Sequence, residues 1–341
     1  MSNSDQSAIL TAASRAPIPA AAYLLTGCIA VIGSNSLVLG PIAPAVAASF
    51  AASVPAVMTA AAAFGLGTAA GVAMPAIYAS SAAIAPPGRE SGTIGVVLTG
   101  WTLSMVAGVS LSAVLADLIH WRAVFAAVAV LAATAVAGLS VSSLRDTRKS
   151  GPAPSPLGAL AVPGILPLLI ACGAFMTAFY GVYGYLGDHL HEGLGEPVSA
   201  NGLAAIAYGL GFGAAALLDG VIDCLGARRV MPFAYLLVAA VYVAIASASG
   251  TFGLLMATIA VWGLANHFGL NVLVMRLTAL DAARRGTIMG LNSAVTYFAV
   301  TVGTAGFGPL YTALGFANCA LVAALLMLVA ASAAAWRSAR Q

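Results

Sequence analysis

Long apolar runs recur along the whole chain, most of them about twenty residues or more in length, with short polar segments between them. Apolar runs of this length can cross the hydrocarbon core of a bilayer as α-helices. We therefore expect an all-α, polytopic membrane protein. The pattern predicts ten helices, at roughly 18–50, 55–85, 91–119, 121–143, 160–187, 198–220, 229–248, 251–279, 284–312 and 315–336.

The run over 55–85 is the least regular of the ten. As one helix it would rise about 46 Å, which is long but compatible with a tilt or with a kink at Pro75. It is too short for two spans and a turn. We predict a single span here.

Composition supports a membrane location and argues against other classes of protein. Hydrophobic residues make up 61% of the chain and charged residues 7%, whereas soluble proteins carry roughly a quarter charged residues. The four cysteines are scattered and form no C-x-x-C pair, so neither a disulfide nor a metal site is expected. The chain has no nucleotide-binding loop and no nucleophile–base pair. We expect no enzymatic activity, no cofactor, no metal and no nucleic-acid partner.

The charged residues orient the predicted helices. Every arginine and lysine except Arg122 falls on one side of a ten-helix arrangement, and Asp117, Asp188, Glu192 and Glu196 gather on the other. By the positive-inside rule the basic side is cytoplasmic, so both termini are expected there. The first residues lack the features of a signal peptide, so the first helix is expected to be retained. The bias toward arginine and alanine suggests a GC-rich bacterial genome, and we expect a bacterial inner-membrane protein.

One internal segment, 144–160, is polar and rich in proline. Such a stretch is typical of a linker. It predicts a cytoplasmic connection between a four-helix bundle over 1–143 and a six-helix bundle over 161–341.

A loop motif after the sixth predicted helix resembles that of a known family. The residues Asp219-Gly-Val-Ile-Asp223-Cys-Leu-Gly226-Ala-Arg228-Arg229 are similar to the G-x-x-x-D-R-x-G-x-R-R loop of the major facilitator superfamily, in its drug:proton-antiporter or sugar-efflux-like branch. Asp219 stands where the family has its first glycine. The resemblance implies that Asp219, Asp223, Gly226, Arg228 and Arg229 form a cytoplasmic gating loop. The alternative is an ordinary basic loop that obeys the charge rule.

The first half of the chain resembles the same family but is shorter. The segments 86–92 and 120–125 are similar to its P-P-E-R-R-G loop and its W-R-x-x-F helix exit. Between them and the first helix, residues 64–71 resemble the middle of a second family helix and run straight into 72–76, which resembles the later part of a fourth. Members of the family have twelve helices in two bundles. The resemblance therefore implies a two-bundle fold that lacks about two helices of the amino-terminal bundle.

The clearest polar segment inside a predicted helix is Asn266-His267-Phe-Gly-Leu-Asn271. His267 and Asn271 are four residues apart and share a helix face. Because imidazole titrates near neutral pH, His267 could carry a proton or bind substrate. A hydrogen bond to a neighbouring helix is the alternative. Since no carboxylate is expected near the middle of the membrane, His267 is the one proton carrier that the sequence offers.

Two further groups of residues are candidates for a substrate site. Tyr180 and Tyr183 lie with Met176 on one stripe of the helix over 160–187, which the resemblance implies lines the cavity. Core packing of these aromatic rings is the alternative. Asn35 of the first helix is a weaker candidate, as are its neighbours Ser34 and Ser36 and, in the ninth helix, Asn292 and Thr296. We expect His267 to face the interface between the halves, near Tyr180 or Tyr183 and across from Asn35.

The resemblance implies a secondary-active carrier of a small organic molecule that works by alternating access, acting as an exporter. Proton coupling and a homodimer that covers the shortened bundle are left open. The alternatives are a degenerate, non-transporting member that serves as a membrane binding or assembly partner, and a deletion product with no settled function.

Overall fold

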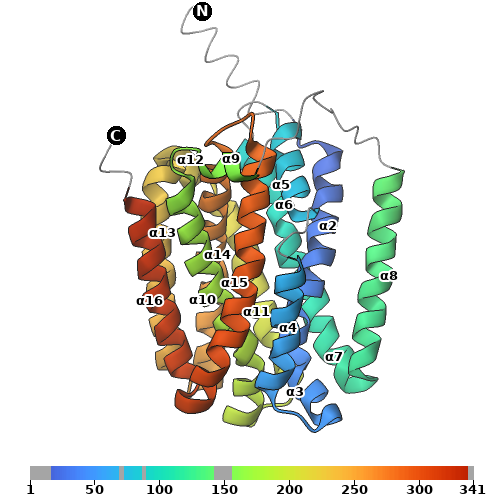
Figure 1. The fold of residues 1–341 in the computed structure, drawn as a ribbon. Coiled ribbons are helices and arrows are strands. Elements are labelled where there is room, and N and C mark those ends of the chain that lie inside the picture. Colours follow the sequence, from blue (N-terminus) through green and yellow to red (C-terminus); the bar gives the residue numbers. More distant parts are fainter. Residues whose placement is uncertain (1–16, 69–72, 87–89, 142–155, 337–341) are drawn as a thin grey trace, which may run out of the picture.

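The computed structural model describes residues 17–68, 73–86, 90–141 and 156–336. Over these residues every regular element is a helix, and the long helices run side by side between two ends of the molecule (Figure 1). α2 begins and α16 ends at the same end, as an even number of crossings requires.

The amino-terminal bundle is built from the first half of the chain. Its elements are α2 (Ala20–Leu37), α3 (Leu39–Phe50), α4 (Val54–Thr68), α5 (Ala73–Ile84), α6 (Glu90–Leu103), the π-helix η1 (Ser104–Val109), α7 (Ser110–Leu118) and α8 (Trp121–Ser140).

The carboxyl-terminal bundle follows a short helix, α9 (Pro156–Leu160). Its elements are α10 (Ile165–Asp188), the π-helix η2 (His189–Gly193), α11 (Ala200–Ala215), the 3₁₀-helix η3 (Ala216–Leu218), α12 (Gly220–Leu225), α13 (Ala227–Ala248), α14 (Phe252–Thr278), α15 (Arg285–Leu314) and α16 (Phe316–Ala335).

The predicted all-α, multi-pass fold is confirmed. In the described part of the chain, nine helical segments are long and apolar enough to cross a membrane. α4 and α5 lie one beyond the other between the two ends and occupy the predicted span over 55–85 (Figure 1). The junction of that span, residues 69–72, and most of the predicted linker lie outside the described residues, so the continuity of the span stays a prediction.

The two bundles meet mainly along three contacts, and α6 also touches α14 and η3. α15 packs on α4 and α5, α10 packs on α3, and α11 packs on α6, η1 and α7. The last contact includes the hydroxyl of Ser110, whose Oγ lies 2.9 Å from the carbonyl of Met105 and 3.0 Å from that of Gly202 on α11. The backbone N–H of Ser110 also donates to the Met105 carbonyl at the end of the π-helix, so the hydroxyl adds a contact between this helix end and α11.

The break between α2 and α3 at Val38 has a cause in the sequence. Pro41 has no backbone N–H, so the carbonyl of Leu37, four residues earlier, has no helical donor. The Tyr183 hydroxyl of α10 donates to this carbonyl at 3.1 Å. The proline therefore frees an acceptor in one bundle that the other bundle uses.

Glycines set the closest helix crossing of the carboxyl-terminal bundle. A Cβ atom at Gly263 of α14 would overlap the carbonyl oxygen of Tyr208, and one at Gly211 of α11 would overlap that of Ala260. Small residues let membrane helices pack backbone against backbone. α11 and α14 are thereby held together over the stretch that carries the polar residues described next.

Candidate functional site

A cavity lies between the two bundles, and its walls are mostly aromatic and apolar. The space open to the centres of water molecules is about 60 Å³, room for roughly four waters at about 15 Å³ each. The residues that line it are Ser36, Leu37, Met74, Tyr78, Trp101, Met105, Phe175, Met176, Phe179, Tyr180, Tyr208, Phe212, Asn266, Leu270, Asn292, Ser293, Thr296 and Tyr297.

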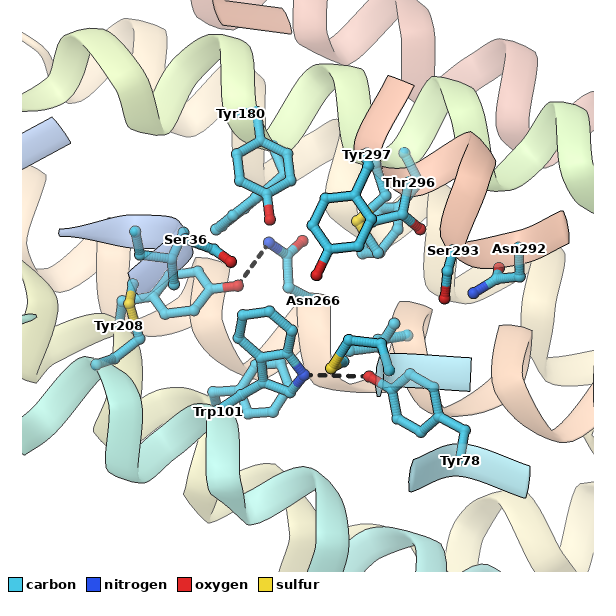
Figure 2. A pocket seen from close by; sticks show the side chains of 18 residues that line it. Ser36, Tyr78, Trp101, Tyr180, Tyr208, Asn266, Asn292, Ser293, Thr296 and Tyr297 are labelled. Atoms are coloured by element: carbon cyan, nitrogen blue, oxygen red, sulfur yellow. Dashed lines mark hydrogen bonds between the residues drawn. The ribbon is translucent and has the colours of Figure 1, made fainter. Parts of the chain in front are cut away.

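The amide of Asn266 is the polar centre of the cavity (Figure 2). Its Nδ2 donates to the Tyr208 hydroxyl at 2.9 Å. Its Oδ1 is buried and accepts no hydrogen bond from the residues that the structure describes. The hydroxyls of Tyr180 and Tyr297 point toward this amide from two other helices. A ligand that donates a hydrogen bond can therefore satisfy a buried acceptor here.

A second hydrogen bond links two aromatic residues of the amino-terminal bundle. The indole Nε1 of Trp101 donates to the Tyr78 hydroxyl at 3.2 Å (Figure 2). At the far side of the cavity, the Oδ1 atom of Asn292 is also buried and unbonded. None of the lining residues is an Asp, Glu, Lys, Arg or His. The site thus offers aromatic faces and a few hydrogen-bonding groups, and no formal charge.

Four of the sequence-predicted residues lie away from this cavity. Asn35 is exposed, because it points away from the interface on α2. Tyr183 is buried but lines a smaller neighbouring cavity, with Pro41 and Asn201. His267 and Asn271 are fully buried on α14. They do not line the cavity, because Asn266 and Leu270 form the face of α14 that does. The expected arrangement of His267 beside Tyr180 or Tyr183 and across from Asn35 is wrong.

His267 and Asn271 instead bind a carboxylate. The Oδ1 atom of Asp219 accepts from His267 Nε2 at 2.9 Å and from Asn271 Nδ2 at 2.8 Å. Asp219 follows η3 and is 8% exposed. Asp219 lies near a helix end, as expected, but its carboxylate reaches His267, a contact that the sequence analysis does not predict. The signal in the sequence is the acidic residue at a position where the family motif has glycine.

The other residues of the loop motif lie at the helix ends around α12. Gly226 has a φ of +81°, a left-handed conformation in which side chains are strained, and it separates α12 from α13. Arg228 and Arg229 are exposed in the first turn of α13. Asp223 is in α12, and its side chain lies outside the described residues. The gating role of this loop stays a prediction.

Most of the aromatic lining is missing from the sequence-based candidates. Trp101, Tyr78 and Tyr297 are not among those candidates, and they become neighbours only when α5, α6 and α15 meet. Met176, named on the same stripe as Tyr180, lines the cavity, as do Ser36, Asn292 and Thr296, which were weaker candidates. Periodicity places a residue on a face of its helix, and which face meets the other bundle is decided by packing.

The profile of the Major Facilitator Superfamily matches residues 18–200, more than half of the chain. The chain belongs to the Major Facilitator Superfamily. The resemblance drawn from the loop motifs is thereby confirmed.

Two bacterial members of the superfamily are similar to it in sequence. An uncharacterized MFS-type transporter of Bacillus subtilis, YwfA, is 27% identical over 271 residues, which cover 77% of this chain and 66% of YwfA. The probable transporter SCO4007 of Streptomyces coelicolor is 31% identical over 166 residues, which cover 46% of this chain and 38% of SCO4007. The chain thus matches less than two thirds of the length of these relatives.

Solved structures of the superfamily share the fold. The human organic anion transporter MFSD10 superimposes with a TM-score of 0.62 at 16% identity, over 92% of this chain and 81% of MFSD10. The Escherichia coli fucose:proton symporter FucP superimposes with a TM-score of 0.60 at 15% identity, over 97% of this chain and 90% of FucP. At these identities the likeness concerns the fold alone, and it confirms a two-bundle membrane protein.

Proposed function

We propose that this chain is a secondary-active carrier that exports a small, uncharged, aromatic or amphipathic molecule by alternating access. The observation that carries the proposal is the charge-free aromatic cavity between the bundles. Carriers of this architecture bind substrate near the middle of the membrane at the interface of their repeats. The membership of the superfamily and the MFS-type relatives support transport as the activity.

The chemistry of the cavity supports an uncharged substrate. An ion placed there would lose its hydration without meeting an opposite charge, which is costly. Aromatic rings bind flat apolar groups, and the free Oδ1 atoms of Asn266 and Asn292 would each accept one hydrogen bond from the substrate. A molecule with an apolar body and one or two donor groups fits both features.

The proposed location is the bacterial inner membrane, with both ends of the chain cytoplasmic. The distribution of basic residues supports this orientation. In this orientation α9 and α12 lie on the cytoplasmic side, with the start of α2 and the end of α16 (Figure 1).

The test is extrusion of a neutral fluorescent amphiphile, N-phenyl-1-naphthylamine, from cells of an efflux-deficient bacterial host that express the chain. Wild type should lower the steady fluorescence, and tetraphenylphosphonium, an apolar cation, should not be extruded. Asn266→Ala should reduce extrusion about tenfold, since one hydrogen bond to a buried polar group contributes roughly 1–2 kcal/mol.

The matched control is Asn35→Ala, the same substitution at an exposed asparagine. It should extrude the amphiphile at the wild-type rate. Equal loss in both variants at equal membrane levels would contradict a substrate role for the cavity. Extrusion of the cation in preference to the neutral probe would overturn the substrate class.

One observation favours the second candidate, a non-transporting member that acts as an assembly partner. α8 is apolar, but Val124 is its one buried residue, so it could present a face to another membrane protein or to a second copy of the chain. Purified protein in liposomes that moves no solute of a chemically broad panel, yet elutes as a stable dimer in mild detergent, would favour this candidate over the carrier.

A further inference from the structure

A groove at one end of the carboxyl-terminal bundle carries positive charge that the central cavity does not use. It lies where α10 and α13 begin and where α14 and α16 end. The space open to the centres of water molecules is about 430 Å³, against about 60 Å³ in the central cavity. Arg228 and Arg276 line the groove, and none of the described residues that line it is an Asp or a Glu. The groove therefore has the room and the charge to take up an anion.

Arg276 has hydrogen-bond donors that the protein leaves unused. It is half-buried in the last turn of α14, and its Nη1 atom donates to Met231 Sδ at 3.0 Å and to the Ala334 carbonyl at 3.2 Å. Both acceptors are uncharged, and no Asp or Glu of the described residues forms an ion pair with Arg276. The N–H groups on Nε and Nη2 thus have no acceptor in the described part of the chain. Two such donors side by side match two oxygens of a phosphate group.

The helix ends around the groove affect an anion in opposite ways. α10 follows Gly164 and α13 begins at Ala227, and no described side chain caps either amino terminus. The backbone N–H groups at such ends carry partial positive charge, which favours an anion. α14 and α16 present carbonyl groups there, and Arg276 offsets part of their negative charge through its bond to the Ala334 carbonyl. The balance at the groove is therefore positive.

The groove lies at the level where the chain leaves the membrane. The candidate span Ala227–Ala248 begins beside it and the candidate span Phe252–Thr278 ends beside it. One to one and a half turns deeper, Ile170 of α10 and Phe233 of α13 are 48% and 72% exposed, as side chains that contact lipid are. A phospholipid could place its phosphate at the arginines and its acyl chains along this apolar surface. A soluble anion would use the arginines alone.

We propose that this groove binds the phosphate headgroup of an anionic phospholipid, such as phosphatidylglycerol or cardiolipin. Arg276 holds the phosphate through Nε and Nη2, and Arg228 adds a second positive charge. Basic pockets between membrane helices attract anionic headgroups, and the apolar stems of arginines suit the edge of the bilayer. The site is separate from the central cavity and does not depend on transport. The proposed orientation of the chain decides only the leaflet, which is the cytoplasmic one.

The test is native mass spectrometry of the full chain in mild detergent, titrated with lipids that differ only in the headgroup. Dioleoyl phosphatidylglycerol is the anionic probe and dioleoyl phosphatidylcholine, which has no net charge, is the control. Wild type should bind one phosphatidylglycerol about tenfold or more tightly than phosphatidylcholine, since each basic residue near the membrane surface contributes roughly fivefold.

Substitutions of the arginines locate the site. Arg276→Gln should weaken phosphatidylglycerol binding by at least about tenfold, because it removes charge-assisted hydrogen bonds. Arg276→Lys should recover only part of the loss, since an ammonium keeps the charge and lacks the planar fork. Arg228→Gln should weaken binding about fivefold. Arg229→Gln is the matched control, because Arg229 is adjacent and exposed but does not line the groove, and it should bind as wild type.

Three results would overturn the proposal. These are equal retention of the two lipids by wild type, equal losses in Arg228→Gln and Arg229→Gln, and displacement of phosphatidylglycerol by millimolar inorganic phosphate, which would mark a site for a soluble phosphate compound. Should Arg276→Gln not yield folded protein, the comparison of Arg228→Gln with Arg229→Gln decides. Failure of the proposed transport looks different, because lipid retention is measured without any transported solute.

Discussion

α8 and α16 close the two bundles and are alike in sequence terms, yet they sit differently in the structure. Each is 20 residues long with a mean hydropathy of 2.2 in its most apolar stretch, but 6% of that stretch is buried in α8 and 44% in α16. α16 packs on α10, α13 and α15, whereas α8 touches α2, α3 and α7 at one edge of the molecule (Figure 1).

The comparison teaches that hydropathy predicts which helices leave water for the membrane. It does not predict whether such a helix contacts lipid or other helices of the protein. Lipid tails are as apolar as leucine, so nothing in an apolar segment forces it against another helix. We therefore expect the carboxyl-terminal bundle to carry most of the stability and the amino-terminal bundle to tolerate change.

The largest difference between the bundles should come from adding one methyl group to a glycine. Gly263→Ala places a Cβ on the Tyr208 carbonyl and forces α11 and α14 apart. We expect a loss of about 3 kcal/mol or more, seen as a fall in folded yield and in the thermal midpoint in nanodiscs. Gly138→Ala in α8 meets Leu24 Cδ1 at an ordinary 3.6 Å and should be neutral or gain a few tenths of a kcal/mol. Similar losses in both would remove the contrast.

Truncating a side chain to alanine should also cost more stability in α16 than in α8, but with a smaller difference than the glycine substitutions. Met327 of α16 is fully buried and Leu131 of α8 is 49% exposed. Met327→Ala should cost about 2–4 kcal/mol because it opens a cavity, and Leu131→Ala less than about 1 kcal/mol because lipid fills the space. Chemical unfolding in mixed micelles gives both values. A cost at Leu131 equal to that at Met327 would indicate that α8 has a protein partner.

Two tyrosines on α10 distinguish the stability of one bundle from contact between the two. Tyr185 donates to the Thr304 carbonyl within its own bundle, and Tyr183 donates to the Leu37 carbonyl of the other. Tyr185→Phe should lower the free energy of unfolding by about 1 kcal/mol. Tyr183→Phe should instead favour separation of the bundles by a similar amount, raising maleimide labelling of a cysteine at Ala204 about fivefold. Equal effects of both variants on labelling would argue against separable bundles.

The prediction with the smallest expected effect on stability tests the orientation of both bundles in the membrane. Single cysteines at Glu196 and Arg285, in a background without native cysteines, should react with impermeant maleimide from opposite sides of the membrane. The Arg285 variant loses one hydrogen bond to the Thr278 carbonyl, so it should cost no more than about 1 kcal/mol. Labelling of both from the periplasm would refute cytoplasmic termini.

The sequence predicts helices better than it predicts their breaks. The eighth predicted helix, 251–279, is observed as Phe252–Thr278, and the tenth, 315–336, as Phe316–Ala335. The turn at Val38 and the π-helix over Ser104–Val109 lie within the continuous apolar spans Ala20–Phe50 and Thr93–Leu118. Pro41 explains the break at Val38, because it leaves the Leu37 carbonyl without a helical donor. The π-helix lies against α11, and this contact exists only in the folded chain.

The sequence predicts which residue types form the polar sites of α14, but it does not predict the direction in which each side chain points. Asn266 and His267 stand together in the sequence, but about 100° of rotation about the helix axis separates them, and so one meets the cavity and the other Asp219. The sequence pattern places Asp219 in a loop motif, because it stands at the end of a predicted helix. That this end reaches the middle of α14 depends on how far α11 and α14 slide past each other, and the glycines at 211 and 263 fix that register.

The adjacency of Asn266 and His267 has a thermodynamic consequence for any molecule that binds the cavity. A ligand that binds the Asn266 amide and moves α14 also moves His267, which is bonded to Asp219 against Gly95 of the other bundle. If that ligand changes the equilibrium between joined and separated bundles by some factor, then separation of the bundles must change the ligand's affinity by the same factor. Ligand affinity measured in wild type and in Tyr183→Phe therefore reports this linkage at equilibrium.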